Sequence, residues 1–170
     1  MNKFIFPLLT SAALLTCNGT VFATSTEVQI YKLEEKDTKT PVGIIKIEEN
    51  AHGLIFIPDL SMLPSGLHGF HVHENPSCGE KNGVVGAAAG GHYDPLNTNK
   101  HLGPYNISGH LGDLPALYVD QKGKATMSVL APRIKKISEI QGHSLMIHAE
   151  GDNYSDKPGG MRLACGIIEG

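Results

Sequence analysis

The chain has 170 residues, of which 41% are hydrophobic and 18% charged, with twenty glycines, ten prolines and a formal net charge of −3 at pH 7. This length fits one domain and argues against a multidomain machine. The apolar content argues against disorder and the glycine content against a helical bundle. The acidic balance argues against nucleic-acid binding by bulk charge.

Residues 1–23 have the pattern of a secretory leader. Lys3 is followed by a short apolar run and then by small residues that end at Ala23, which is typical of a signal peptide. The run is too short to span a membrane, and no later stretch approaches the roughly 20 apolar residues that a spanning helix needs. Cys17 offers lipidation as an alternative, but Thr16 is a poor residue before a modified cysteine, so we predict cleavage after Ala23 and export to the periplasm.

The predicted mature domain, residues 24–170, keeps two cysteines, Cys78 and Cys165. Two thiols in an oxidising compartment normally pair, whereas two free buried thiols are much less common there. We therefore predict one disulfide bridge. Because it closes a long segment, it is expected to remove roughly 4 to 5 kcal/mol of unfolded-chain entropy.

Short strands separated by turns recur along the mature chain. Apolar and polar residues alternate with period two in Val28–Tyr31 and Ala125–Val129. Further short apolar runs are bounded by turn residues and lie at 42–47, 54–60, 116–119, 145–149 and 166–168. Seven or eight strands without helices predict an all-β antiparallel sandwich or barrel. Glu74–Leu114 and Glu150–Ala164 are long irregular segments, which are usually functional.

Three histidines are predicted to lie together on strands. His71 and His73 are two residues apart, so both imidazoles leave the same face of a strand. His148 leaves its strand on the side opposite to the apolar residues Leu145 and Ile147. All three are therefore expected on the outer wall of the barrel, under the two irregular segments that follow these strands. Imidazole ligands without a nearby thiolate suit copper or an accessible zinc.

The first irregular segment holds a second cluster. Three imidazoles and one carboxylate suit a closed tetrahedral zinc site; the residues are His92, His101, His110 and Asp113. An H-x-H pair alone could equally be two polar residues on the outside of a strand. Its combination with a third strand histidine and this loop cluster is much more specific. His52 and His143 are interpreted as ordinary loop histidines.

Six motifs, in order, resemble those of bacterial exported copper/zinc superoxide dismutases. They are Gly66–Glu74, Gly90–Pro95, His101–Pro104, Gly109–Pro115, His148–Asn153 and Arg162–Gly166. The resemblance covers essentially the whole mature chain. It implies a Greek-key antiparallel eight-stranded barrel or sandwich with two long functional loops. It also implies an enzyme that converts superoxide to dioxygen and hydrogen peroxide in the periplasm, as a monomer or homodimer.

The resemblance also implies a role for each site residue. Copper ligands are His71, His73, His92 and His148, and zinc ligands are His92, His101, His110 and Asp113. His92 then bridges the two cofactors and takes up a proton during the copper redox cycle, while zinc orders the loop. Asp152 links a copper ligand to a zinc ligand. Cys78 and Cys165 match the family disulfide, and His68 matches a conformational residue without a metal role.

Arg162 matches the arginine that lies over the copper and attracts the anionic substrate; the alternative is a surface arginine in an ion pair. Only nine residues, Asn153–Met161, lie between Asp152 and Arg162 (162 − 152 − 1 = 9). This loop is shorter than is usual in the family, which bears on substrate guidance but not on the ligands.

An exported copper/zinc buffer without turnover is the alternative function. A cupredoxin electron carrier is disfavoured because that site needs a thiolate ligand.

Overall fold

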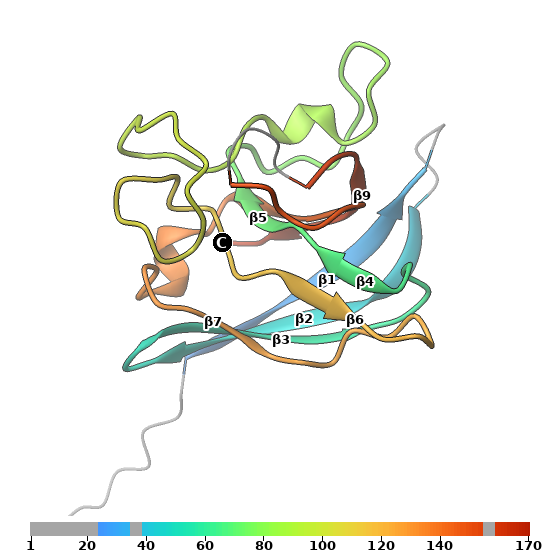
Figure 1. The fold of residues 1–170 in the computed structure, drawn as a ribbon, viewed down its shortest axis with the longest axis horizontal. Helices are drawn as coiled ribbons and strands as arrows, with labels where there is room; N and C mark the ends of the chain where they lie inside the picture. Colours follow the sequence, from blue (N-terminus) through green and yellow to red (C-terminus); the bar gives the residue numbers. More distant parts are fainter. Residues whose placement is uncertain (1–23, 35–38, 155–158) are drawn as a thin grey trace, which may run out of the picture.

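The computed structural model describes residues 24–34, 39–154 and 159–170 (Figure 1). The predicted signal peptide, with Cys17, therefore lies outside the described residues. Within them the chain forms nine β-strands: β1 Ser25–Leu33, β2 Lys39–Asn50, β3 Gly53–Leu60, β4 Gly66–His68, β5 Phe70–His73, β6 Leu117–Val119, β7 Val129–Ala131, β8 His143–His148 and β9 Arg162–Ile168. Two 3-10 turns, η2 Ala87–Ala89 and η3 Ile137–Glu139, are the helical elements of this part of the chain.

The strands form a curled seven-stranded antiparallel sheet in the order β5-β8-β9-β1-β2-β3-β7, with a small β4-β6 sheet beside it. Non-consecutive neighbours such as β3 and β7 mark the crossovers of a Greek key. This confirms the predicted all-β antiparallel barrel. The structure has nine strands instead of the predicted eight because one strand changes sheets at Gly69 and is divided into β4 and β5. The Gly69 N–H donates to the Glu150 carbonyl at 2.7 Å, and the Gly69 carbonyl accepts from the His148 N–H at 2.8 Å.

Several predicted boundaries differ from those of the observed strands, and two of the differences have a clear cause. Ala125 bridges to Leu60, but the residues from 126 to 128 are exposed and β7 begins only at Val129. This stretch lies at the edge of the sheet, where one side has no neighbouring strand to continue the ladder. The second irregular segment ends at Met161 because β9 already begins at Arg162, pairing with His148 of β8.

The core is built from the inward side of the strands. Phe56 of β3 and Phe70 of β5 meet edge to face at a centroid distance of 5.5 Å, surrounded by buried aliphatic side chains. Leu145 and Ile147 of β8 belong to this core, as their spacing predicts. Among the described residues, no helix is both long and apolar enough to cross a membrane.

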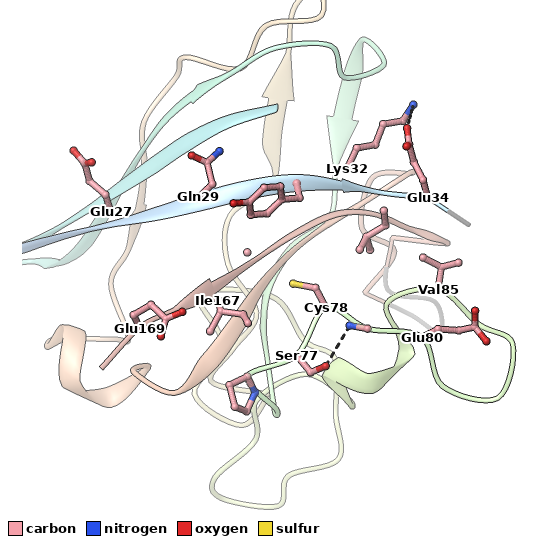
Figure 2. Close-up of a pocket in the computed structure, with 15 residues that line it drawn as sticks. Glu27, Gln29, Lys32, Glu34, Ser77, Cys78, Glu80, Val85, Ile167 and Glu169 are labelled. Carbon is pink, nitrogen blue, oxygen red and sulfur yellow. Dashed lines mark hydrogen bonds and ion pairs between the residues drawn. The ribbon is translucent and has the colours of Figure 1, made fainter. Parts of the chain in front are cut away.

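The predicted disulfide is confirmed: Cys78 and Cys165 are bonded, with a Cα–Cα distance of 5.7 Å. It joins the start of the segment that follows β5 to the last strand. A groove of about 740 Å³ lies beside it, between β1, β9 and the chain around Cys78 (Figure 2). Glu27 and Ile167 are among its lining residues, and none of the predicted metal ligands lines it. The metal candidates lie elsewhere: His71, His73 and His148 are buried on β5 and β8, and the loop candidates belong to the first long segment.

Candidate metal centre

β5 and β8 bring the three strand histidines together. The two strands pair antiparallel, with His71 opposite Met146 and His73 opposite Ser144. The rings leave the sheet on the side away from the core, yet His71, His73 and His148 are only 0%, 1% and 3% exposed. The covering segments account for this burial, because Asp113 bridges to His71 of β5 through the backbone. The predicted outward face and the predicted cover are both confirmed.

Backbone carbonyls set the direction of two of these rings. His73 donates from Nδ1 to the Gly90 carbonyl and His148 from Nδ1 to the Gly160 carbonyl, each at 3.0 Å. The two Nε2 atoms therefore face each other, 3.4 Å apart. A hydrogen bond on one ring nitrogen fixes the tautomer and leaves the other nitrogen as a ligand. Sequence reasoning missed both carbonyls, because a backbone acceptor has no residue signature.

Asp152 lies between the two clusters, as the resemblance implies. Its Oδ1 atom is 2.9 Å from His71 Nε2 and 3.3 Å from His101 Nε2. The carboxylate thereby holds one ring from each cluster by the nitrogen that faces away from the ligand group. His71 Nδ1 is consequently left facing the strand cluster.

The loop cluster converges on one oxygen atom. Asp113 Oδ1 lies 2.8 Å from His92 Nδ1, 3.0 Å from His101 Nδ1 and 3.5 Å from His110 Nδ1. Four ligands placed tetrahedrally about an ion with bonds of about 2.0 Å are about 3.3 Å from one another. The observed spacings are therefore those of a zinc-sized site. The Gly103 N–H donates to the other carboxylate oxygen at 3.2 Å and fixes the Asp113 side chain.

Two groups of donor atoms, each within 4.8 Å of one another, share His71 and His92. One contains His71, His73, His92 and His148; the other contains His71, His92, His101 and Asp113. His110 is not a member of the second group, which contains His71 instead. Because His71 Nε2 is held by Asp152, His71 belongs chemically with the strand cluster, while His110 faces Asp113 with its Nδ1.

Unpartnered buried atoms supply a direct test of metal fit. Among the described residues, four buried side-chain atoms have no hydrogen-bond partner: His71 Nδ1, His110 Nδ1, His101 Nε2 and Ser144 Oγ. A buried polar atom without a partner costs free energy that a bound cation would offset. Of these, His71 Nδ1 and His110 Nδ1 face the groups described above. The donor set therefore fits two adjacent cations.

Electrostatics separate the two clusters. Burial lowers the pKa of His71 to about 3, of His73 to about 2 and of His148 to about 4. These imidazoles are neutral at pH 7, which is the form that binds a metal. Burial also acts on His101, but contacts with Asp113 and Asp152 outweigh it and raise its pKa to about 9. The pKa values of both carboxyls are lowered because the histidine contacts outweigh their burial.

Arg162 is the first residue of β9 and lies beside the strand cluster. It pairs with His148 between strands, and its guanidinium donates to the carbonyls of Gly86 and Gly90. The Gly90 carbonyl also accepts from His73, so one oxygen atom joins the arginine to a candidate ligand. Arg162 is half-buried and makes no ion pair among the described residues, which disfavours the interpretation as a surface ion pair.

The remaining histidines have other contacts. His68 is buried, and its ring nitrogens lie 2.7 Å from the His148 carbonyl and 2.8 Å from the Pro64 carbonyl. It therefore braces the chain next to a candidate ligand without joining either donor group. His52 is exposed, and His143 contacts the Glu74 carbonyl at 2.8 Å.

A barrel that carries two adjoining imidazole-rich donor groups, with His92 between them, defines a metalloprotein with two adjacent cations. Residues 41–168 match the copper/zinc superoxide dismutase family, and the chain belongs to that family. Copper and zinc are the metals that this family binds.

Related proteins are similar to this chain in sequence and structure over most of its length. The superoxide dismutase [Cu-Zn] of Actinobacillus pleuropneumoniae is 52% identical over 151 residues, which cover 84% of this chain and 80% of that protein. Superoxide dismutase [Cu-Zn] 1 of Salmonella typhimurium strain LT2 is 51% identical over 98% of this chain and 99% of its own length. The solved structure of the Brucella abortus Cu/Zn superoxide dismutase has a TM-score of 0.81 at 51% identity, covering 86% of this chain and all of that one.

Proposed function

We propose that the chain dismutes superoxide: two superoxide anions and two protons give dioxygen and hydrogen peroxide. The observation that carries this proposal is the position of His92, which belongs to both donor groups and, unlike His71, is not held by Asp152. A metal buffer needs two sites but gains nothing from joining them through one ring. A redox enzyme gains a group that can exchange a proton beside the reacting metal.

The proposed copper ligands are His71, His73, His92 and His148, and the proposed zinc ligands are His92, His101, His110 and Asp113. Their support is the convergence of donor atoms and the outer hydrogen bonds that aim them. Neutral, buried imidazoles suit copper in both of its redox forms. The carboxylate of Asp113 suits zinc and balances part of its charge.

Copper supplies the one-electron redox change and zinc a fixed positive charge when the two are bound. His92 Nδ1 faces Asp113, so Nε2 is directed to the strand cluster. The ring centroids of His92 and His71 are 3.9 Å apart. Forming hydrogen peroxide consumes two protons. His92 Nε2 is placed to hold one of them and to release it beside the reacting oxygen atoms.

Arg162 is proposed to attract the substrate. The chain has a net charge of −3, so attraction of an anion must come from a local field. Two of the N–H groups of the guanidinium donate to the carbonyls of Gly86 and Gly90, and these hydrogen bonds hold its charge near His73 and His148. Its positive charge contributes, after burial and His92, to lowering the pKa values of both histidines, which places it within electrostatic reach of the strand cluster.

Superoxide decay and product yields test the function. The protein loaded with one copper and one zinc per chain should consume superoxide catalytically and release one hydrogen peroxide for every two anions. Metal-free protein and a loaded His148→Ala variant are the controls, and both should be inactive. A copper/zinc buffer would instead stop after about one equivalent of superoxide per copper. That outcome would refute the enzymatic assignment.

We also propose that residues 1–23 direct export and that residues 24–170 act in the periplasm, with the disulfide as support for an oxidising compartment. The related Salmonella enterica enzyme is described as monomeric, with a TM-score of 0.76 and 46% identity. We propose that this chain is a monomer too, in preference to a homodimer. Cell fractionation with N-terminal sequencing and sedimentation of the mature protein test these two points.

A further inference from the structure

Arg133 joins the barrel to the loop that holds the zinc candidates. Its Nη1 donates to the His110 carbonyl at 2.8 Å, and its Nη2 donates to the Gly109 carbonyl at 2.7 Å. A longer contact of 3.4 Å runs from Nη1 to the Gly103 carbonyl. The guanidinium thus spans two consecutive carbonyls, one of which belongs to a proposed zinc ligand.

The base of this contact is part of the rigid barrel. Arg133 lies just after β7 and immediately before Ile134, whose side chain is fully buried in the core. The Leu54 N–H of β3 donates to the Ile134 carbonyl at 2.9 Å. Gly53 also packs closely against the backbone of Ala131 and leaves no room for a side chain there. The arginine therefore projects from a fixed point at the edge of the sheet.

The loop segment that it contacts lies between other anchors of the long segment. The disulfide holds the start of the long segment at Cys78, and a hydrogen bond of 3.1 Å from the Leu114 N–H to the Phe70 carbonyl holds its end. Between them, the His110 N–H donates to the Lys100 carbonyl at 2.9 Å, which closes the turn on itself but not on the barrel. The Val72 N–H of β5 donates to the Gly112 carbonyl at 2.9 Å, and Arg133 adds the side-chain contact from the barrel to the carbonyls of Gly109 and His110.

We propose that Arg133 is a positioning residue for the zinc site. By holding the Gly109 and His110 carbonyls together, it fixes the backbone from which the His110 ring approaches Asp113. His110 Nδ1 has the longest of the three approaches to Asp113 Oδ1, at 3.5 Å. Its position therefore depends most on the backbone that carries it. This inference rests on the zinc assignment proposed above.

The planar fork of arginine is needed for this contact. Two parallel N–H groups reach two neighbouring carbonyls, whereas a lysine keeps the charge but has no fixed fork. Lysine at this position should therefore recover part of the effect. Removing an outer contact of a metal ligand typically weakens metal affinity 10- to 100-fold.

The test compares Arg133→Gln and Arg133→Lys with a matched control, Lys135→Gln. Lys135 is an exposed cation on the same segment. Its ammonium group donates to the backbone carbonyl of His52 at 3.1 Å, which does not belong to the loop cluster. The zinc dissociation constant is measured by competition with a chromophoric chelator, and copper content is measured in parallel. Arg133→Gln should bind zinc about 10- to 100-fold more weakly, Arg133→Lys should lie between it and wild type, and Lys135→Gln should match wild type. Copper content should stay near one per chain in all of them.

Melting of the metal-free and zinc-loaded forms separates positioning from plain stabilisation. If Arg133 positions the zinc site, the gain in melting temperature on adding zinc shrinks in Arg133→Gln. The proposal is overturned if Arg133→Gln lowers the melting temperature of both forms equally and leaves the zinc dissociation constant unchanged. If Arg133→Gln does not fold, Arg133→Lys decides, because wild-type zinc affinity in that variant also overturns it. A wild-type protein that fails to bind zinc would instead refute the proposed zinc site itself.

Discussion

Removing the Cys78–Cys165 bridge should destabilise the metal-free protein strongly. The bonded residues are 87 positions apart. In the polymer account, closing a loop of that length removes about 4 to 5 kcal/mol of unfolded-chain entropy. Cys165 is buried with Met146 and Ala89, so the folded state keeps its packing when the bond is absent. The loss should therefore come close to the entropic figure.

Urea denaturation of the metal-free protein, with and without a thiol reductant, measures this loss. With a slope of about 2 kcal/mol per molar urea, the midpoint should fall by roughly 2 M when the bridge is reduced. A Cys78→Ala variant is the control, because it has no bridge to lose and the reductant should not move its midpoint. An unchanged midpoint in the wild-type protein would refute the reasoning that the bridge limits the unfolded chain.

Four other changes test the site. His71→Ala should abolish dismutation and copper binding while zinc stays near one per chain, as measured by metal analysis. Arg162→Glu should slow superoxide decay strongly with both metals bound, and added salt should slow the wild type because screening limits the local field to about 8 Å at physiological ionic strength. Asp152→Ala should weaken both metals by about 10- to 100-fold in chelator competition, because Asp152 holds one ring of each cluster. The free energy of unfolding of the metal-free protein, measured in urea, should fall as pH falls from about 6.5 to about 4. Histidines of the unfolded chain take up protons in this range, whereas burial lowers the pKa of His148 in the folded protein to about 4. This difference in the pKa of His148 alone corresponds to a loss of about 3 kcal/mol of stability.

Each of these predictions has an outcome that contradicts it. Full activity of His71→Ala would remove this residue from the copper site. Wild-type rates in Arg162→Glu with metals intact would make the arginine an ordinary surface residue. Unchanged affinities in Asp152→Ala would show that the carboxylate does not orient the rings. A flat stability profile between pH 6.5 and 4 would mean that the strand histidines titrate alike in the folded and unfolded chain.

The strand histidines could be predicted from the sequence because the period of a strand determines which face a side chain leaves. His71 and His73 share a face for that reason, and the buried partners of His148 in β8 follow the same rule. The cysteine pair followed from export and counting. The stretch from Ala125 to Val129 failed because alternation alone does not reveal whether a neighbouring strand is present at a sheet edge.

Contacts made by the backbone could not be predicted in the same way. The carbonyls of Gly90 and Gly160 aim two of the proposed copper ligands, and those of Gly109 and His110 accept from Arg133. Any residue has a carbonyl, so its direction depends on how loops far apart in sequence fold against each other. A lone arginine after a strand carries no signal of such a contact.

Anomalous diffraction from crystals of the copper- and zinc-loaded protein, recorded at the absorption edge of each metal, locates the two ions separately. The proposed ligand assignment is the hypothesis under test. It predicts a copper peak among His71, His73, His92 and His148. It predicts a separate zinc peak among His92, His101, His110 and Asp113, with the His92 ring between the two. A single mixed peak, or a zinc peak that does not contact His92, would contradict it.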